Sequence, residues 1–164
     1  MTVQASGLPA ILLATQATLQ ALGPRADDQG NPMLDNNGKE LLLFEGVALG
    51  ANDSVPNGPW AILQHQQFTA PQLEGSEREI TDWNLQLRVL IPITDHYVAE
   101  LMLARCIEGV REGFRRHIKQ GLPSIERTRV TAGDALYVII NKITYRAIDL
   151  TIMVREKVTV SFAA

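Results

Sequence analysis

Apolar and polar residues alternate over an unusually long stretch near the end of the chain, "AIDLTIMVREKVTVSF" (Ala147–Phe162). Every second residue from Ile148 onward is apolar except Glu156, and the positions between them are mostly polar or charged. Alternation of this kind is typical of a β-strand with one buried face. Such a strand would span about 50 Å at roughly 3.3 Å per residue, whereas a domain of this size has a radius of gyration of about 15 Å.

We expect this strand to change course at Glu156, because an unpaired carboxylate turned into an apolar core is costly. A bulge or bend there would keep "IDLTIMV" in the sheet of the domain and direct "KVTVSF" toward a neighbouring molecule. An exposed sheet end at Glu156 explains the pattern equally well, so both interpretations stay open.

Shorter runs predict the other strands. Trp60–Phe68 and Trp83–Ile93 alternate in the same way, and "ELLLFEGVAL" is typical of a short buried strand. Ile125–Val130 and Ala135–Tyr145 predict two more strands, joined by a turn at "TAGD". The short connections indicate that the last three strands are antiparallel.

Two segments show helical spacing of their apolar residues. Leu8–Leu22 follows Ser6, a suitable cap, and Tyr97–Gln120 follows Asp95, another suitable cap. Gly, Pro, Asp and Asn are concentrated in two segments, 25–40 and 50–59, which predicts long polar loops. The expected fold is therefore α+β, with an antiparallel β-sheet packed on one face by two α-helices, in a single domain over residues 1–164.

The composition is that of an ordinary globular protein, with 46% apolar and 20% charged residues in 164. No run of eighteen apolar residues occurs, and residues 1–23 lack the basic start of a signal peptide. We therefore expect synthesis in a cytoplasm and no contact with a membrane.

Charge is distributed unevenly along the chain. Residues 1–96 contain four basic and eleven acidic side chains, a net −7, while residues 97–164 contain eleven basic and seven acidic ones, a net +4. This asymmetry suits a contact between unlike surfaces of two molecules, although mixing of the charges on one folded surface explains it equally well. The basic half is too sparse to indicate binding to duplex DNA.

Residues of catalytic type do not form a recognisable set. Cys106 is the single cysteine and lies in a helical pattern, which favours a buried structural thiol. His65, His96 and His117 are far apart and have no metal ligand at the usual spacing. No phosphate loop or nucleophile elbow is present, so we expect no enzymatic activity, no metal and no cofactor.

The order of elements resembles that of the tail terminator (tail completion) family of tailed bacteriophages. The resemblance covers nearly the whole chain and includes "GPWAILQHQQF", "WNLQLRVLIPI" and "YVIINKITYRAIDLTIMVREKVTVSF". It lies in the order of the segments and in their pattern of apolar and polar residues, since none of them is a diagnostic motif. It implies a virion protein that forms a hexameric ring, caps the tail tube, stops its polymerisation and contacts the head connector, with DNA only passing through the lumen.

An assembly subunit of this kind needs surfaces that bind a second copy. The acidic segment before Trp83, the basic end of the second helix and the charged part of the long strand are the expected interface. Its candidate residues are Glu77, Glu79, Asp82, Arg115, Arg116, Arg155, Glu156 and Lys157.

Two alternatives remain at this level. Another neck or tail-tube subunit would share the same architecture. A small α+β ligand-binding or hydrolytic domain, with a pocket that uses His65, His96 or Trp60, is the alternative from a different class.

Overall fold

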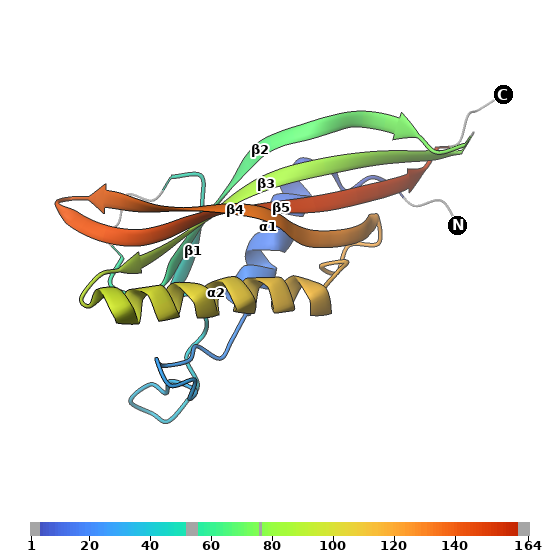
Figure 1. Cartoon of the computed structure of the whole chain (residues 1–164). Coiled ribbons are helices and arrows are strands. Elements are labelled where there is room, and N and C mark those ends of the chain that lie inside the picture. Colours follow the sequence, from blue (N-terminus) through green and yellow to red (C-terminus); the bar gives the residue numbers. More distant parts are fainter. Residues whose placement is uncertain (1–3, 52–55, 76, 161–164) are drawn as a thin grey trace.

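A five-stranded sheet with two helices on one face makes up most of the structure, a computed structural model that describes residues 4–51, 56–75 and 77–160 (Figure 1). The order of strands in the sheet is β1-β2-β3-β5-β4. In chain order the elements are α1 (Gly7–Gln20), β1 (Gly46–Leu49), β2 (Trp60–Leu73), β3 (Arg78–Pro92), α2 (His96–Arg116), β4 (Ile125–Ile140) and β5 (Ile143–Thr159). The α+β class and the helical layer agree with the sequence prediction. The sheet is not wholly antiparallel, because β1 pairs with β2 in parallel.

Both helices pack their apolar side against the same face of the sheet. Ile11 and Leu19 of α1, with Val110 and Phe114 of α2, join one buried cluster. Alternate residues of two central strands, β3 and β5, face the helices and complete this cluster. They are Leu85, Leu87, Val89, Ile91, Ile148, Leu150, Ile152 and Val154. Strands that bury every second residue and helices that bury one face therefore share a single core.

The predicted N-terminal cap is present in α2 and absent in α1. The Asp95 side chain accepts a hydrogen bond from the Val98 backbone N–H at 3.0 Å and caps α2, as predicted. The Ser6 side chain makes no such bond to α1, which corrects the prediction of a serine cap. Gly113 lets α2 approach the chain after α1, since a Cβ there would lie 2.3 Å from Leu22 Cδ2.

The long strand stays inside the sheet. β3 pairs with β5 without interruption from Arg78↔Thr159 to Pro92↔Tyr145, so a second strand of almost equal length accompanies it. The expected bulge at Glu156 is wrong, and so is the alternative of an exposed end, because Glu156 is buried with 5% of its surface exposed. The irregularities lie on the partner strand β4, which inserts Glu126 and Thr131 between paired positions.

The segment expected to leave the domain is paired as well. Lys157 to Thr159 are in register with β3, and the Val160 N–H donates to the Glu77 carbonyl at 2.7 Å. The remainder of that segment, 161–162, lies outside the described residues.

The predicted turn at "TAGD" is also wrong. Residues 131–134 lie inside β4, and the chain reverses at Asn141 and Lys142 instead, with φ of 47° and 67°. Gly133 serves packing rather than a turn, because a Cβ there would lie 2.6 Å from Leu150 Cδ2. A glycine in a strand is as consistent with close packing as with a turn, and the pattern alone does not distinguish the two.

Residues 24–42 form a projection that we call the acidic arm. It extends from the helical side of the molecule, away from the sheet (Figure 1). Two turns shape it, and in each an aspartate Oδ1 accepts two backbone N–H groups: Asp27 from Gln29 and Asn31, and Asp35 from Asn37 and Lys39. The predicted loop is therefore an ordered structure.

Candidate functional site

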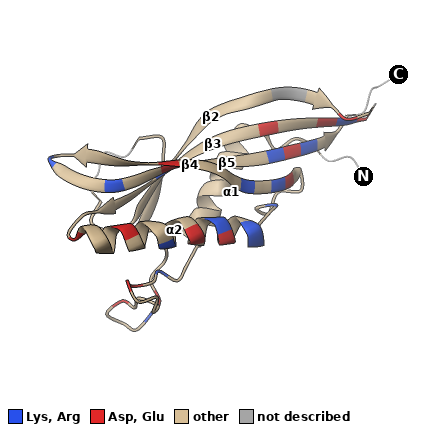
Figure 2. Cartoon of the chain, viewed as in Figure 1, with Lys and Arg blue, Asp and Glu red and all other residues tan. Residues whose placement is uncertain are grey.

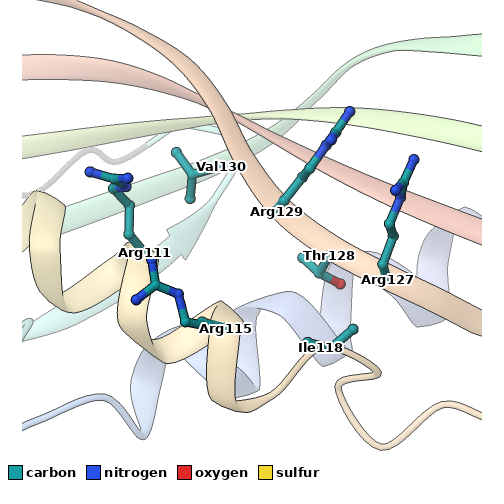
Figure 3. Close-up of a pocket in the computed structure, with 7 residues that line it drawn as sticks. All are labelled: Arg111, Arg115, Ile118, Arg127, Thr128, Arg129 and Val130. Carbon is teal, nitrogen blue, oxygen red and sulfur yellow. The ribbon is translucent and has the colours of Figure 1, made fainter.

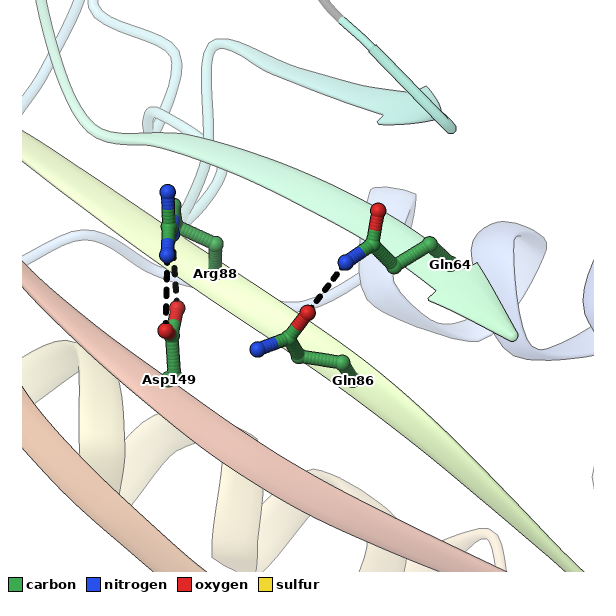
Figure 4. A network of polar contacts seen from close by, with 4 residues as sticks. All are labelled: Gln64, Gln86, Arg88 and Asp149. Carbon is green, nitrogen blue, oxygen red and sulfur yellow. Dashed lines mark hydrogen bonds and ion pairs between the residues drawn. The ribbon is translucent and has the colours of Figure 1, made fainter. Parts of the chain in front are cut away.

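The face of the sheet opposite the helices is polar at its centre and carries no helix. Arg88 of β3 binds Asp149 of β5 through two hydrogen bonds of 2.7 and 2.8 Å, and Gln64 of β2 donates to Gln86 of β3 (Figure 4). The pairing with Asp149 raises the pKa of the Arg88 guanidinium. These bonds join three adjacent strands and stiffen the sheet on the side that the helices leave open.

Six of the eight predicted interface residues come together at one end of this sheet. Glu77 directly precedes β3, Glu79 and Asp82 lie in its first half, and Arg155, Glu156 and Lys157 lie on the paired part of β5. Acidic and basic side chains alternate along these neighbouring strand ends (Figure 2). The remaining two residues, Arg115 and Arg116, lie in the last turn of α2.

Several of these charges are neutralised within the chain. The Arg155 guanidinium donates to both Asp82 oxygens at 2.7 and 2.8 Å, and this hydrogen bonding lowers the pKa of Asp82. Lys157 Nζ lies 2.5 Å from a Glu74 oxygen and 3.5 Å from a Glu126 oxygen, and the bond to Glu74 raises the pKa of Lys157. The acidic and basic halves of the sequence thus meet inside one molecule at this end.

Glu156 has a structural role that its sequence context does not reveal. Its Oε2 accepts hydrogen bonds from the Ser6 backbone N–H at 2.7 Å and from Ser124 Oγ at 2.9 Å. Trp83 Nε1 approaches Oε1 at 3.4 Å. The buried carboxylate therefore accepts a hydrogen bond from the backbone N–H at the N-terminus of α1, which has no acceptor within the helix.

A groove between α2 and β4 was missed by the sequence prediction. It has a volume of about 300 Å³ and is lined by Arg111, Arg115, Ile118, Arg127, Thr128, Arg129 and Val130 (Figure 3). We call it the basic groove. Arg115 binds Glu112, while Arg111, Arg127 and Arg129 form no salt bridge with any residue that the structure describes. The side chains of Arg127 and Arg129 extend from β4 away from α2, whereas Arg111 and Arg115 extend from α2 itself (Figure 3).

Exposed apolar side chains at both hairpins were also missed. Phe68 and Leu73 of the β2–β3 hairpin are 53% and 63% exposed, and Tyr137, Ile139 and Ile143 of the β4–β5 hairpin are exposed to a similar degree. We call these groups the two apolar tips. The register of β3 with β5 places the two hairpin turns at opposite ends of the sheet.

Residues of catalytic type remain scattered. His65 lies within β2, His96 starts α2 and His117 follows its end. Cys106 is buried, and burial raises the pKa of its thiol to about 12, as suits the structural role predicted. Among residues 4–51, 56–75 and 77–160, no group of three or more His, Cys, Asp or Glu side chains is arranged to hold a metal ion. No helix in this part of the chain is long and apolar enough to cross a membrane.

No protein-family model matches the sequence, and comparison with the curated proteins finds no similar one.

Proposed function

We propose that this chain is a tail terminator of a tailed bacteriophage, a subunit that assembles head to tail into a ring at the end of the tail tube. The observation that carries the proposal is the pair of apolar tips at opposite ends of one stiff sheet. Exposed large apolar side chains beside each hairpin turn favour a protein contact over a solvated surface. Two different contact surfaces at opposite ends suit a heterologous interface, which closes into a ring when the rotation between copies allows it.

The open sheet face gives such a ring a second continuous surface. Its polar centre, with Arg88, Asp149, Gln64 and Gln86, is stiffened by side-chain bonds across three strands. A polar, rigid face suits the inside of a channel through which DNA passes without sequence-specific contact. The order of segments described above, which resembles the tail terminator family, supports the choice of this virion position.

The partners of the proposed ring are further copies of this chain, six by the family resemblance, the tail tube protein below and the head connector protein above. Its location is the neck of the virion, after synthesis in the host cytoplasm. Another neck or tail-tube position uses the same surfaces and differs only in the neighbours.

The ligand-binding alternative has weaker support. His65 pairs with Leu85 across β2 and β3, and Leu85 is seven residues from the end of β3 that precedes His96. At roughly 3.3 Å per residue these histidines lie about 20 Å apart along the sheet. His65 and His96 therefore do not share one pocket, and a pocket that uses one of them or Trp60 stays the alternative function.

Electron microscopy of the purified chain mixed with tail tubes tests the proposal. We expect rings with a central opening that bind at tube ends and prevent further growth of the tubes. Tubes that lengthen normally, with the chain absent from their ends, would contradict the proposal.

A further inference from the structure

We propose that the open sheet face binds the phosphate backbone of DNA through Arg127 and Arg129. This inference rests on the proposed ring and names the groups through which its inner face contacts DNA. Its starting point is a pair of guanidinium groups that the fold places on that face without a partner inside the chain.

Strand register places both arginines on the face that the helices leave open. Val154 belongs to the core beneath the helices, so the next residue, Arg155, extends to the other side. Arg127 pairs with Arg155, and Arg155 pairs with Asp82, so these side chains form one row across β4, β5 and β3. Arg129 follows Arg127 by two residues and therefore extends to the same side, rather than toward α2 across the basic groove (Figure 3).

Neither arginine has an anionic partner within the described chain. The Asp82 carboxylate already binds Arg155 with both of its oxygens, at 2.7 and 2.8 Å. Arg127 and Arg129 form no salt bridge with any of the described residues. The Nε of Arg127 is buried and has no hydrogen-bond acceptor in the same part of the protein. A buried donor without an acceptor is costly, so an anion that accepts from it would relieve that cost.

The surroundings of the pair favour phosphate over a protein surface. The neighbouring side chains on this face carry amide and hydroxyl groups, namely Gln67, Asn84, Gln86 and Thr151. Among the described residues, no exposed large apolar side chain lies in this part of the face, although the centre of a protein interface usually depends on one. Arginine, asparagine, glutamine and threonine are side chains that commonly bind phosphate oxygens.

Spacing and repetition suit a nucleic acid backbone. Two positions along one strand separate the arginines by about 7 Å, so both guanidinium groups can reach one phosphate or two neighbouring phosphates. One copy has too few unpaired charges to hold a duplex tightly, and Asp134 on the same face of β4 opposes the binding. The ring repeats the pair in every copy. Such contacts do not depend on sequence and let DNA slide, as passage through a channel requires.

A fluorescent DNA duplex of random sequence tests this contact by anisotropy over a range of salt concentrations. The wild-type ring is expected to bind the duplex with an affinity that falls as salt rises. Arg127→Gln with Arg129→Gln is expected to lower the affinity at low salt about tenfold or more and to flatten its salt dependence. Arg127→Lys with Arg129→Lys keeps the charges and is expected to bind almost as the wild type does.

The matched control, Arg111→Gln with Lys39→Gln, removes the same charge from α2 and the acidic arm, away from the open face, and is expected to bind DNA as the wild type does. Unchanged DNA binding by the Arg127→Gln, Arg129→Gln ring would overturn this inference and leave the proposed ring intact. An equal loss in the control would overturn it too, since overall charge would then explain the binding.

Circular dichroism and sedimentation velocity establish that each variant is folded and forms rings. A folded Arg127→Gln, Arg129→Gln chain that forms no rings would place the arginines between copies and overturn the inference. Displacement of DNA by polyglutamate at equal charge would indicate an acidic protein as the partner and would also overturn it. A wild-type chain that stays monomeric would instead overturn the proposed function itself.

Discussion

The Glu156 carboxylate accepts the Ser6 backbone N–H at 2.7 Å, so the last strand of the sheet caps the first helix of the chain. Ser6 Oγ in turn lies 2.6 Å from Ser124 Oγ, which itself donates to Glu156. Helix N-termini bind anions because their first N–H groups have no partner within the helix. The Glu156 charge, which seemed incompatible with a core in the sequence, thus joins the last strand to the start of the first helix.

Removal of this carboxylate is expected to destabilise the fold. Glu156→Ala leaves the Ser6 N–H and the Ser124 hydroxyl without their acceptor, which we expect to lower the free energy of unfolding by about 3 kcal/mol. Glu156→Gln keeps one acceptor and should cost less than Glu156→Ala. Urea unfolding measures both, with Thr159→Ala, exposed on the same strand, as control. A Glu156→Ala protein as stable as the control would contradict the assigned role.

The Asp82–Arg155 pair is expected to make stability depend on pH. Because Arg155 lowers the pKa of Asp82 in the folded state, the pair stabilises above the unfolded pKa of about 3.9 and this contribution fades as pH falls through the lowered value. Asp82→Asn should therefore reduce stability by about 1 kcal/mol at pH 7 and by progressively less below about pH 4. Unfolding curves from pH 7 to pH 2 measure the difference. Asp28→Asn, on the arm, serves as the control, and an Asp82→Asn deficit that is constant over this range would contradict the assignment.

Cys106 is expected to resist thiol reagents in the folded protein. It is 2% exposed, and burial raises its pKa to about 12, so the reactive thiolate is scarce at pH 8. Labelling should be slow in buffer and complete in denaturant. Ala17→Cys in a Cys106→Ala background places a thiol on an exposed position and should react at once. Equal rates for the two thiols in buffer would show that the site opens readily.

The apolar tip of the β4–β5 hairpin is expected to matter for assembly and not for folding. Ile139 is 71% exposed, so Ile139→Glu should leave the free energy of unfolding of the monomer within about 0.5 kcal/mol of the wild type. Burial of Ile139 between copies would make the same change prevent ring formation. Size-exclusion chromatography with light scattering compares it with Gln20→Glu on α1. Rings of Ile139→Glu as stable as those of Gln20→Glu would exclude this tip from the interface.

Local patterns were sufficient to predict much of the fold. Both helices, their placement on one face and the strands from Trp60 and Trp83 follow from apolar periodicity, because each element buries a single face. The cap at Asp95 needed only the three residues that follow it. A strand as long as β5 was predicted, but residues 143–145 were assigned to the preceding strand Ala135–Tyr145, and the course of the strand at Glu156 was not predicted.

The errors have a common origin in contacts that are distant in sequence. Glu156 seemed incompatible with a core because Ser6 and Ser124, its donors, lie 150 and 32 residues away. Gly133 resembled a turn residue because its contact with Leu150 is not visible in the local sequence. The groove lies between α2 and β4, and neither element indicates it alone.

Sedimentation velocity of the purified wild-type chain, over a range of concentrations and at low and molar salt, tests the central claim most directly. The proposed ring predicts one closed species of about six copies, with a mass near six times 18.1 kDa. A monomer or dimer at every concentration, at low as well as at high salt, would contradict the claim that this chain is a ring subunit.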